Sequence, residues 1–265
     1  MANIHPSAII HPGAIVEDGA VIGEGSRIGP FCHIGPEVVL GARCEVKSHV
    51  VITGDTHLGD DCTIWQFAVI GEVPQDKKFG GEKTRLRIGH RARIREHVTI
   101  NTGTAGGGGL TSIGDDCLLL AGSHVAHDAH VGNNVTIVNS TAVAGHCIIE
   151  DDVVIGGLCG IHQFVRIGRG AMIGALSMVT HDVIPYGLVQ GPRGELDGLN
   201  LVGLKRRGME RPDIHALRAA YEALRSGEGS FHARAEALAE NTSLPVREVV
   251  SFILGPTERQ FLTPK

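Results

Sequence analysis

The sequence has few aromatic residues and no long apolar run. Phenylalanine, tyrosine and tryptophan make up 4% of its 265 residues, with a single tryptophan. A core built on large rings is therefore excluded, and aliphatic side chains must fill it. No apolar stretch approaches the roughly 20 residues that cross a bilayer, and no charged and apolar leader follows Met1. We expect a cytoplasmic protein without a transmembrane segment.

A surplus of basic residues is also absent, because the formal net charge is -5 at pH 7. This balance argues against a general nucleic-acid binder. Glycine, by contrast, is abundant, with 37 residues. Many glycines and few rings favour a repetitive β architecture of short strands and tight turns.

Isoleucine, leucine or valine recurs every six residues over 4–70, 88–100 and 113–179, which makes 27 hexads. The fifth position of the hexad is Ala, Ser, Thr, Cys or Val in 26 of them, and Pro74 is the exception. Position five and the next position one lie two residues apart, so both side chains point inward from one short strand. Three such edges close a triangular coil of 18 residues. The pattern predicts an all-β parallel β-helix of hexapeptide repeats over residues 1–189.

The six cysteines all fall at position five of a hexad. They are Cys32, Cys44, Cys62, Cys117, Cys147 and Cys159. A shared inward slot for small residues explains them, so we interpret them as core residues and not as disulfide or metal positions.

The period stops after Val179, where prolines and glycines mark a change of structure. Residues 190–265 are predicted to form a small C-terminal α-helical domain that caps the last coil. Its expected helices span 199–207, 213–225, 231–240 and 246–254.

Two insertions interrupt the repeat, at residues 76–87 and 106–112, and hexad numbering places both at the same corner of the triangle. His127, His146 and His162 lie on hexads that start 18 residues apart, so they share that corner on successive coils. Neighbouring coils are roughly 4.8 Å apart. His124 ends the preceding edge. Imidazoles gathered in this way suit a general base or a metal site.

Asp128 follows His127 directly, and a carboxylate on one imidazole nitrogen would raise the basicity of the other. Spacing alone leaves an exposed turn aspartate equally possible.

Basic residues gather in two places, within residues 76–95 and at Lys205, Arg206, Arg207 and Arg211. Such clusters are either solvated faces or sites for an anionic substrate. The second reading is chemically reasonable because guanidinium groups form bidentate hydrogen bonds with phosphate. The four glycines at 106–109 are interpreted as a flexible loop, since no helix pattern follows them as a phosphate cradle would need.

Six motifs together resemble one enzyme family over nearly the whole chain. They are Ile-His-Pro-Ser-Ala-Ile at 4–9, Gly-Glu-Val-Pro-Gln-Asp at 71–76, His-Val-Ala-His-Asp at 124–128, Ala-Gly-His at 144–146, Gly-Ile-His-Gln-Phe at 160–164 and Gly-Leu-Lys-Arg-Arg-Gly at 203–208. The set resembles the UDP-N-acetylglucosamine O-acyltransferases. The resemblance implies a left-handed β-helix, although the general crossover rule alone would favour the right-handed course.

The same resemblance implies the activity and the partners. The family moves an (R)-3-hydroxyacyl group from acyl carrier protein to the glucosamine 3-hydroxyl of UDP-N-acetylglucosamine, as the first step of lipid A biosynthesis. Its sites lie between the subunits of a homotrimer. It implies no metal and no cofactor, because the acyl donor is carried on the phosphopantetheine of acyl carrier protein.

Residue roles also follow from the resemblance. His127 matches the general base, Asp128 its partner, and Gly145 the backbone N–H that faces the thioester oxygen. The expected substrate-binding residues are Asp76 and Lys78 in the first insertion, His124, His146 and His162 on sugar and acyl group, Gln163, Asn200, Arg206 and Arg207 near the nucleotide, and Ala175 at the end of the acyl tunnel.

Three positions depart from the family pattern, namely Asn101, Thr102 and Val202, and they leave open whether the acceptor is the ordinary sugar or a 3-amino analogue. A zinc carbonic anhydrase of the hexapeptide-repeat kind would bind its metal through three histidines at a subunit interface, for which His124, His127, His146 and His162 are candidates. The helical tail and the second basic cluster have no role there. A non-catalytic scaffold would need no ordered histidine corner.

Overall fold

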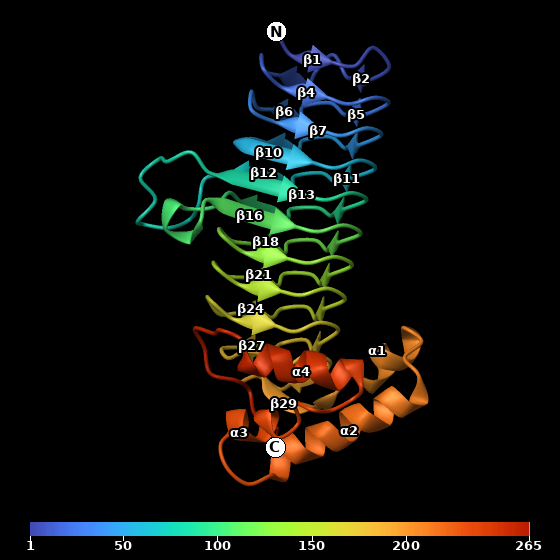
Figure 1. Cartoon of the computed structure of the whole chain (residues 1–265). Helices are drawn as coiled ribbons and strands as arrows, with labels where there is room; N and C mark the ends of the chain where they lie inside the picture. Colours follow the sequence, from blue (N-terminus) through green and yellow to red (C-terminus); the bar gives the residue numbers. More distant parts are fainter. Residues whose placement is uncertain (265) are drawn as a thin grey trace.

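Each predicted hexad forms one short strand, β1 to β27, in the computed structural model, which describes residues 1–264. The strands build three parallel sheets, here named A, B and C, that form the three sides of a prism (Figure 1). The predicted parallel β-helix of hexapeptide repeats is confirmed.

Sheet A contains β1 (Asn3–Ile4), β4 (Val21–Ile22), β7 (Val39–Leu40), β10 (Asp55–Leu58), β13 (Arg85–Ile88), β16 (Leu110–Ile113), β19 (His130–Val131), β22 (Ile148–Ile149) and β25 (Arg166–Ile167). Sheet B contains β2 (Ile9–Ile10), β5 (Arg27–Ile28), β8 (Glu45–Val46), β11 (Thr63–Ile64), β14 (Arg93–Ile94), β17 (Leu118–Leu119), β20 (Thr136–Ile137), β23 (Val154–Ile155), β26 (Met172–Ile173), β28 (Gly187–Gln190) and β29 (Glu195–Leu199). Sheet C contains β3 (Ile15–Val16), β6 (His33–Ile34), β9 (Val51–Ile52), β12 (Val69–Glu72), β15 (Thr99–Asn101), β18 (His124–Val125), β21 (Ala142–Val143), β24 (Gly160–Ile161) and β27 (Met178–Val179).

The inward residues of positions one and five fill the prism. Ile52 and Ile70 of sheet C and Ile64 of sheet B are fully buried. Their register is in phase from coil to coil, so each aliphatic side chain packs on its counterpart above and below. A parallel sheet whose inner face is closed in this way needs no other layer on that side.

The six cysteines confirm their assignment to the core, since all are buried and free. Their thiols follow one pattern, in which position five donates to the carbonyl of position two on the next coil. Cys147 bonds the His162 carbonyl at 3.1 Å, and Cys117 bonds the Gly132 carbonyl at 3.1 Å. Burial raises the pKa of the Cys117 thiol to about 11.

The two insertions leave the same corner, between sheets C and A, as the hexad numbering predicts. The first loop, residues 73–84, joins β12 to β13, and the second loop, residues 102–109, joins β15 to β16. They project side by side from the prism (Figure 1), and the second contains a short 3-10 turn, Ala105–Gly107. The Glu82 carboxylate links them by accepting the Ala105 N–H at 3.1 Å.

The C-terminal part adds a hairpin and four helices. Strands β28 and β29 pair antiparallel and extend sheet B beyond the last coil. The helices are α1 (Leu201–Arg206), α2 (Arg211–Ser226), α3 (Phe231–Glu236) and α4 (Leu244–Leu254), and they gather at the end of the prism (Figure 1). All four predicted helices are present, although α3 ends before residue 240. The expected boundary at residue 190 falls at the end of β28, within the hairpin.

A buried ion pair joins this part to the prism. Asp182 is inaccessible to solvent and accepts hydrogen bonds from Arg166 Nε at 2.7 Å and from Thr257 Oγ1 at 2.7 Å. The Arg166 guanidinium lies 4.3 Å from the centre of the Phe252 ring in α4. Within residues 1–264, no helix is both long enough and apolar enough to cross a bilayer.

Candidate active site

The corner between sheets C and A, here called the C–A corner, brings together the predicted histidines. His127 lies in the turn between β18 and β19, His146 in the next turn along the axis, and His162 in the one after. The His127 and His146 rings meet edge to face at 5.0 Å, and the His146 ring stacks on Phe164 at 4.4 Å. The continuous column of rings is therefore completed by Phe164, while His162 sits beside it.

His127 and Asp128 form a buried pair at the centre of this corner. His127 Nδ1 lies 2.9 Å from Asp128 Oδ2, and the two residues are 5% and 1% exposed. The possibility of a solvated turn aspartate is thus excluded. An ionised carboxylate can only accept hydrogen bonds, so in a neutral His127 ring this contact would hold the proton on Nδ1 and leave the lone pair on Nε2. Asp76 Oδ2 faces that Nε2 at 4.0 Å.

Gly145 packs directly against the His127 ring. A Cβ at this position would lie 2.5 Å from His127 Cε1 and 2.8 Å from Nε2, so no side chain fits. The absence of a side chain lets the backbone approach the basic nitrogen as closely as a substrate group would.

His124 and His146, which flank the pair, are both neutral. The His124 Nδ1 and Thr99 Oγ1 atoms lie within hydrogen-bonding distance, at 2.7 Å. Burial is the main cause that lowers the pKa of both His124 and His146 below the ordinary imidazole value. Both rings are therefore uncharged at neutral pH and can donate or accept hydrogen bonds.

His162 and Gln163 are exposed and are held by the C-terminal tail. Arg259 Nη2 donates to His162 Nδ1 at 2.6 Å, and Arg259 Nε donates to the Gln163 carbonyl at 2.9 Å. The sequence carried no signal for Arg259, since it lies 96 residues from Gln163 in a segment without a repeat.

The first loop is anchored at both ends by residues that depart from the family pattern. The Asn101 side-chain amide donates to the Glu72 and Val73 carbonyls at 3.3 and 3.0 Å, at the start of the loop. Thr102 accepts a hydrogen bond from the Thr84 hydroxyl at 3.0 Å, at its end. Both departures therefore serve the loop that carries Asp76.

Within that loop, the Lys78 backbone N–H donates to Asp76 Oδ1 at 3.0 Å and orients the carboxylate. The Lys78 side chain is exposed. Val202, the third departure, is 62% exposed on α1.

The glycine-rich second loop contacts the buried pair. Its 3-10 turn rests on Asp128. Thr104 donates to the Asp128 carboxylate through its backbone N–H at 2.8 Å and its hydroxyl at 2.6 Å. Thr104 was hidden among the position-five residues of the repeat, and Gly107 was noted only as one of the four glycines at 106–109.

The other predicted residues lie at different corners. Asn200 caps α1, where its Oδ1 accepts the Gly203 N–H at 3.0 Å and its Nδ2 donates to the Gly170 carbonyl at 3.0 Å. Arg207 donates to the same carbonyl at 3.2 Å, and Arg206 next to it is exposed. Gly170 belongs to the turn between sheets A and B. The polar atoms of Asn200 are thus occupied by structural contacts.

Ala175 occupies the third corner, in the turn between β26 of sheet B and β27 of sheet C, and it is exposed. The residues predicted for one site are therefore distributed over three corners of a single prism.

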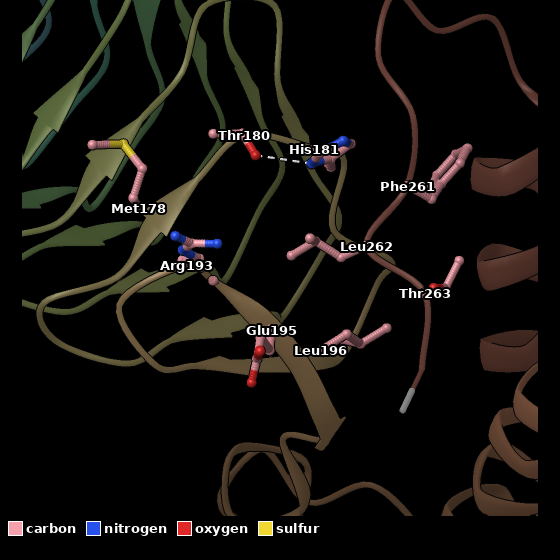
Figure 2. Close-up of a pocket in the computed structure, with 10 residues that line it drawn as sticks. Met178, Thr180, His181, Arg193, Glu195, Leu196, Phe261, Leu262 and Thr263 are labelled. Atoms are coloured by element: carbon pink, nitrogen blue, oxygen red, sulfur yellow. Dashed lines mark hydrogen bonds between the residues drawn. The ribbon is translucent and has the colours of Figure 1, made fainter.

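Several cavities lie near these residues, and one of about 350 Å³ is lined by Arg207. A groove of about 460 Å³ runs beside the C–A corner and is lined by Asp128, His146 and Phe164. A cavity of about 550 Å³ lies at the end of the prism, between β27, the hairpin and the tail. Figure 2 shows Met178 and Arg193 on one side of it and Leu262 on the other. None of the predicted site residues lines this cavity at the end of the prism.

The zinc alternative requires three histidine ligands. Among the described residues, His127, Asp128 and His146 offer ligand atoms within 4.8 Å of one another. His162 lies outside this group, and both Asp128 oxygens already accept hydrogen bonds. The donor set therefore does not fit a three-histidine site within one chain.

A three-sided hexapeptide β-helix with a histidine corner is the architecture of hexapeptide-repeat transferases. A family model described as bacterial transferase hexapeptide (six repeats) matches residues 1–36, 19–54, 110–145 and 146–181. A second, described as Udp N-acetylglucosamine O-acyltransferase, domain 2, matches residues 182–261. The chain belongs to the UDP-N-acetylglucosamine O-acyltransferase family.

Known relatives support this assignment. The acyl-[acyl-carrier-protein]–UDP-N-acetylglucosamine O-acyltransferase of Paracoccus denitrificans is 66% identical over 76% of this chain and 77% of its own length. The Agrobacterium fabrum enzyme of that name is 45% identical over 82% of this chain and 81% of its own length. The solved UDP-N-acetylglucosamine acyltransferase from Campylobacter jejuni is 36% identical, covers 99% of this chain and 100% of its own, and superposes with a TM-score of 0.86. The solved enzyme of that name from Arabidopsis is 31% identical, covers 98% of this chain and 100% of its own, and superposes with a TM-score of 0.81.

Proposed function

We propose that this chain transfers an (R)-3-hydroxyacyl group from acyl carrier protein to the 3-hydroxyl of the glucosamine ring of UDP-N-acetylglucosamine, the reaction that opens lipid A biosynthesis. Family membership supports the acyl transfer and its two substrates. The observation that carries the mechanism is the buried His127–Asp128 pair, whose Nε2 is left as a hydrogen-bond acceptor.

The proposed chemistry needs a base because a sugar hydroxyl is a weak nucleophile at neutral pH. His127 Nε2 takes the hydroxyl proton while the oxygen attacks the thioester carbonyl, and Asp128 stabilises the imidazolium that forms. Gly145 packs against the ring, and its backbone N–H is the proposed donor to the oxyanion of the tetrahedral intermediate. Collapse of the intermediate breaks the C–S bond, and the departing thiolate recovers the proton from His127.

Asp76 has a separate part in this proposal. Its Oδ2 atom lies 4.0 Å from His127 Nε2, too far for a strong ion pair but suited to a group that sits between them. A sugar hydroxyl placed there can donate to one of these two atoms and be aligned by the other. His124, His146, His162 and Lys78 would contact the remainder of the sugar and the acyl group.

The assembled enzyme in this proposal is a homotrimer. Only another copy can bring the arginines of the A–B corner and Ala175 of the B–C corner to the histidines of the C–A corner, because a rigid prism keeps its own corners apart. Three-fold packing of prisms places unlike corners of neighbours together. Both substrates carry phosphate and are soluble in water, in keeping with a cytoplasmic enzyme that needs no cofactor of its own.

The test is the His127→Ala variant. Turnover should fall by the roughly 10²–10⁴-fold that loss of a general base causes, while the Michaelis constant for the sugar nucleotide stays near that of the wild type. His97→Ala is the matched control, since His97 is an exposed turn histidine at another corner. A folded His127→Ala enzyme with near-normal turnover would refute the mechanism.

A further inference from the structure

The second loop covers the one face of Asp128 that the β-helix leaves open. Thr104 supplies two donors to the carboxylate, its N–H to Oδ1 at 2.8 Å and its hydroxyl to Oδ2 at 2.6 Å. The same hydroxyl accepts the Gly107 N–H at 3.2 Å, which closes the 3-10 turn over the carboxylate. On the other side, the Asp128 backbone N–H donates to Thr111 Oγ1 at 2.8 Å.

The second loop lies so close to Asp128 that only glycine fits at positions 103 and 107. A Cβ on Gly107 would meet Asp128 Cγ at 2.1 Å and its oxygens at 2.3 and 2.5 Å. A Cβ on Gly103 would lie 2.7 Å from Oδ1. These contacts, and not the β-helix alone, leave Asp128 at 1% exposure.

Thr104 differs from the other position-five residues in the partner of its hydroxyl. Two other position-five hydroxyls donate to a position-two carbonyl on the next coil. Ser26 bonds the Gly41 carbonyl at 2.8 Å, and Thr141 bonds the Gly156 carbonyl at 2.6 Å. Thr104 stands at position five of the coil above Asp128 and turns its hydroxyl to the carboxylate instead.

We propose that Thr104 is a positioning residue for the acyl transfer and that the Ala105–Gly107 turn is a fixed cover that keeps water from Asp128. This inference rests on the proposed role of His127 as base. Oδ2 is shared by the Thr104 hydroxyl and His127 Nδ1, so the threonine fixes the direction in which the oxygen faces the imidazole. It thereby selects the tautomer with the Nε2 lone pair towards the substrate.

The charged and titratable groups around His127 explain why the orientation of the Asp128 carboxylate affects the tautomer of the imidazole. The titratable groups that face His127 are Asp128, Asp76, His146 and His124. With Asp76 Oδ2 4.0 Å from Nε2, a loosely held Asp128 would favour the other tautomer, in which the proton moves from Nδ1 to Nε2 and the N–H is directed to Asp76. Nε2 would then carry the proton and could not accept one from a hydroxyl.

The first test compares Thr104→Val with Thr104→Ser. Valine keeps the shape of the side chain but loses the hydroxyl, so turnover should fall roughly ten- to a hundred-fold, the factor that one hydrogen bond to a charged group is worth. The Michaelis constant for the sugar nucleotide should change less than about two-fold, because Thr104 does not reach the substrate. Thr104→Ser keeps the donor and should recover most of the turnover.

The second test uses neighbouring glycines of the same turn. Gly107→Ala drives a methyl group into the Asp128 carboxylate and should lower turnover with little effect on the Michaelis constant. Gly106→Ala is the matched control, because a Cβ at Gly106 meets nothing within 4 Å. Circular dichroism and the melting temperature of each variant separate loss of chemistry from loss of fold.

A double variant tells action through Asp128 from a merely structural effect. If Thr104 works by holding the carboxylate, Thr104→Val should cost little further turnover in an Asp128→Asn background. Full additivity, or wild-type turnover in both Thr104→Val and Gly107→Ala, would overturn the proposal. If His127→Ala is inactive in the same assay, such a result overturns only the role of Thr104. If His127→Ala is active, the proposed function itself is wrong.

Discussion

Single residues at the turns of the prism distinguish the corner with the candidate active site from the other corners. Position four of most turns has a positive φ, 57° at Asp128, 61° at His146 and 65° at Phe164. Rings at this position stack elsewhere too, as Phe67 and His97 do at 5.1 Å on the B–C corner. Stacked histidines are therefore no sign of function by themselves. The distinguishing feature is a buried carboxylate in the same column.

Acid sensitivity follows from the two neutral histidines. Burial lowers the pKa of His124 and His146, so the unfolded chain takes up protons that the folded rings resist. Their contribution to stability is fully present above the ordinary imidazole pKa of about 6.5 and is lost progressively as the pH falls below it. The melting temperature of the wild type should drop between pH 7.5 and pH 5.5, and His146→Gln should reduce that drop. An equal reduction in His97→Gln, whose side chain is exposed, would contradict this cause.

The elements of this protein differ in how far sequence alone predicts them. The 27 strands were predictable because the inward slots impose a six-residue period that no helix shares. The helices were predictable from caps and apolar spacing. The hairpin of β28 and β29 was not, because it follows the end of the period, where the prolines and glycines indicated only a change of structure. The covering turn over Asp128 could not be foreseen either, since Thr104 lies 24 residues from Asp128, in the second loop.

The attachment of the helical part depends on one buried pair. Asp182 is fully buried, Arg166 is 12% exposed, and their nitrogen and oxygen are 2.7 Å apart. Asp182→Asn leaves the guanidinium without its counter-charge and should lower the free energy of unfolding by about 3 kcal/mol, typical of a broken buried pair. Denaturant titration followed by circular dichroism measures this loss.

The control for that variant is an ion pair on the surface. Arg43 and Asp61 pair at 2.7 Å but are 56% and 42% exposed, so Asp61→Asn should change stability little. Equal losses in Asp182→Asn and Asp61→Asn would show that the buried pair does not hold the two parts together.

At the scale of the whole molecule, the predicted site residues lie on three different corners, and this distribution constrains how they can form one active site. Ala175 is exposed on the B–C corner of an isolated chain, yet the family resemblance assigns it to the end of an acyl tunnel. In a trimer that corner would face a neighbour. Ala175→Met should then shift preference to shorter acyl chains, since excluding two or three methylenes loses roughly 0.8 kcal/mol for each. Competition among acyl carrier protein thioesters of different length measures the shift, and an unchanged preference would place the tunnel end elsewhere.

The decisive experiment on the assembly is complementation between two inactive chains. Replacing Arg206 and Arg207 together by alanine should raise the Michaelis constant for the sugar nucleotide, because these arginines are proposed to bind its diphosphate. If they serve the histidine corner of a neighbouring chain, every trimer that mixes this variant with His127→Ala contains one intact site. Random mixing makes about three quarters of the trimers mixed, so the coexpressed protein should regain roughly a quarter of the wild-type activity at low sugar nucleotide. Each variant alone is the control. If both groups instead belonged to one chain, no mixture could restore a site, and coexpression would give only the average of the two defective enzymes.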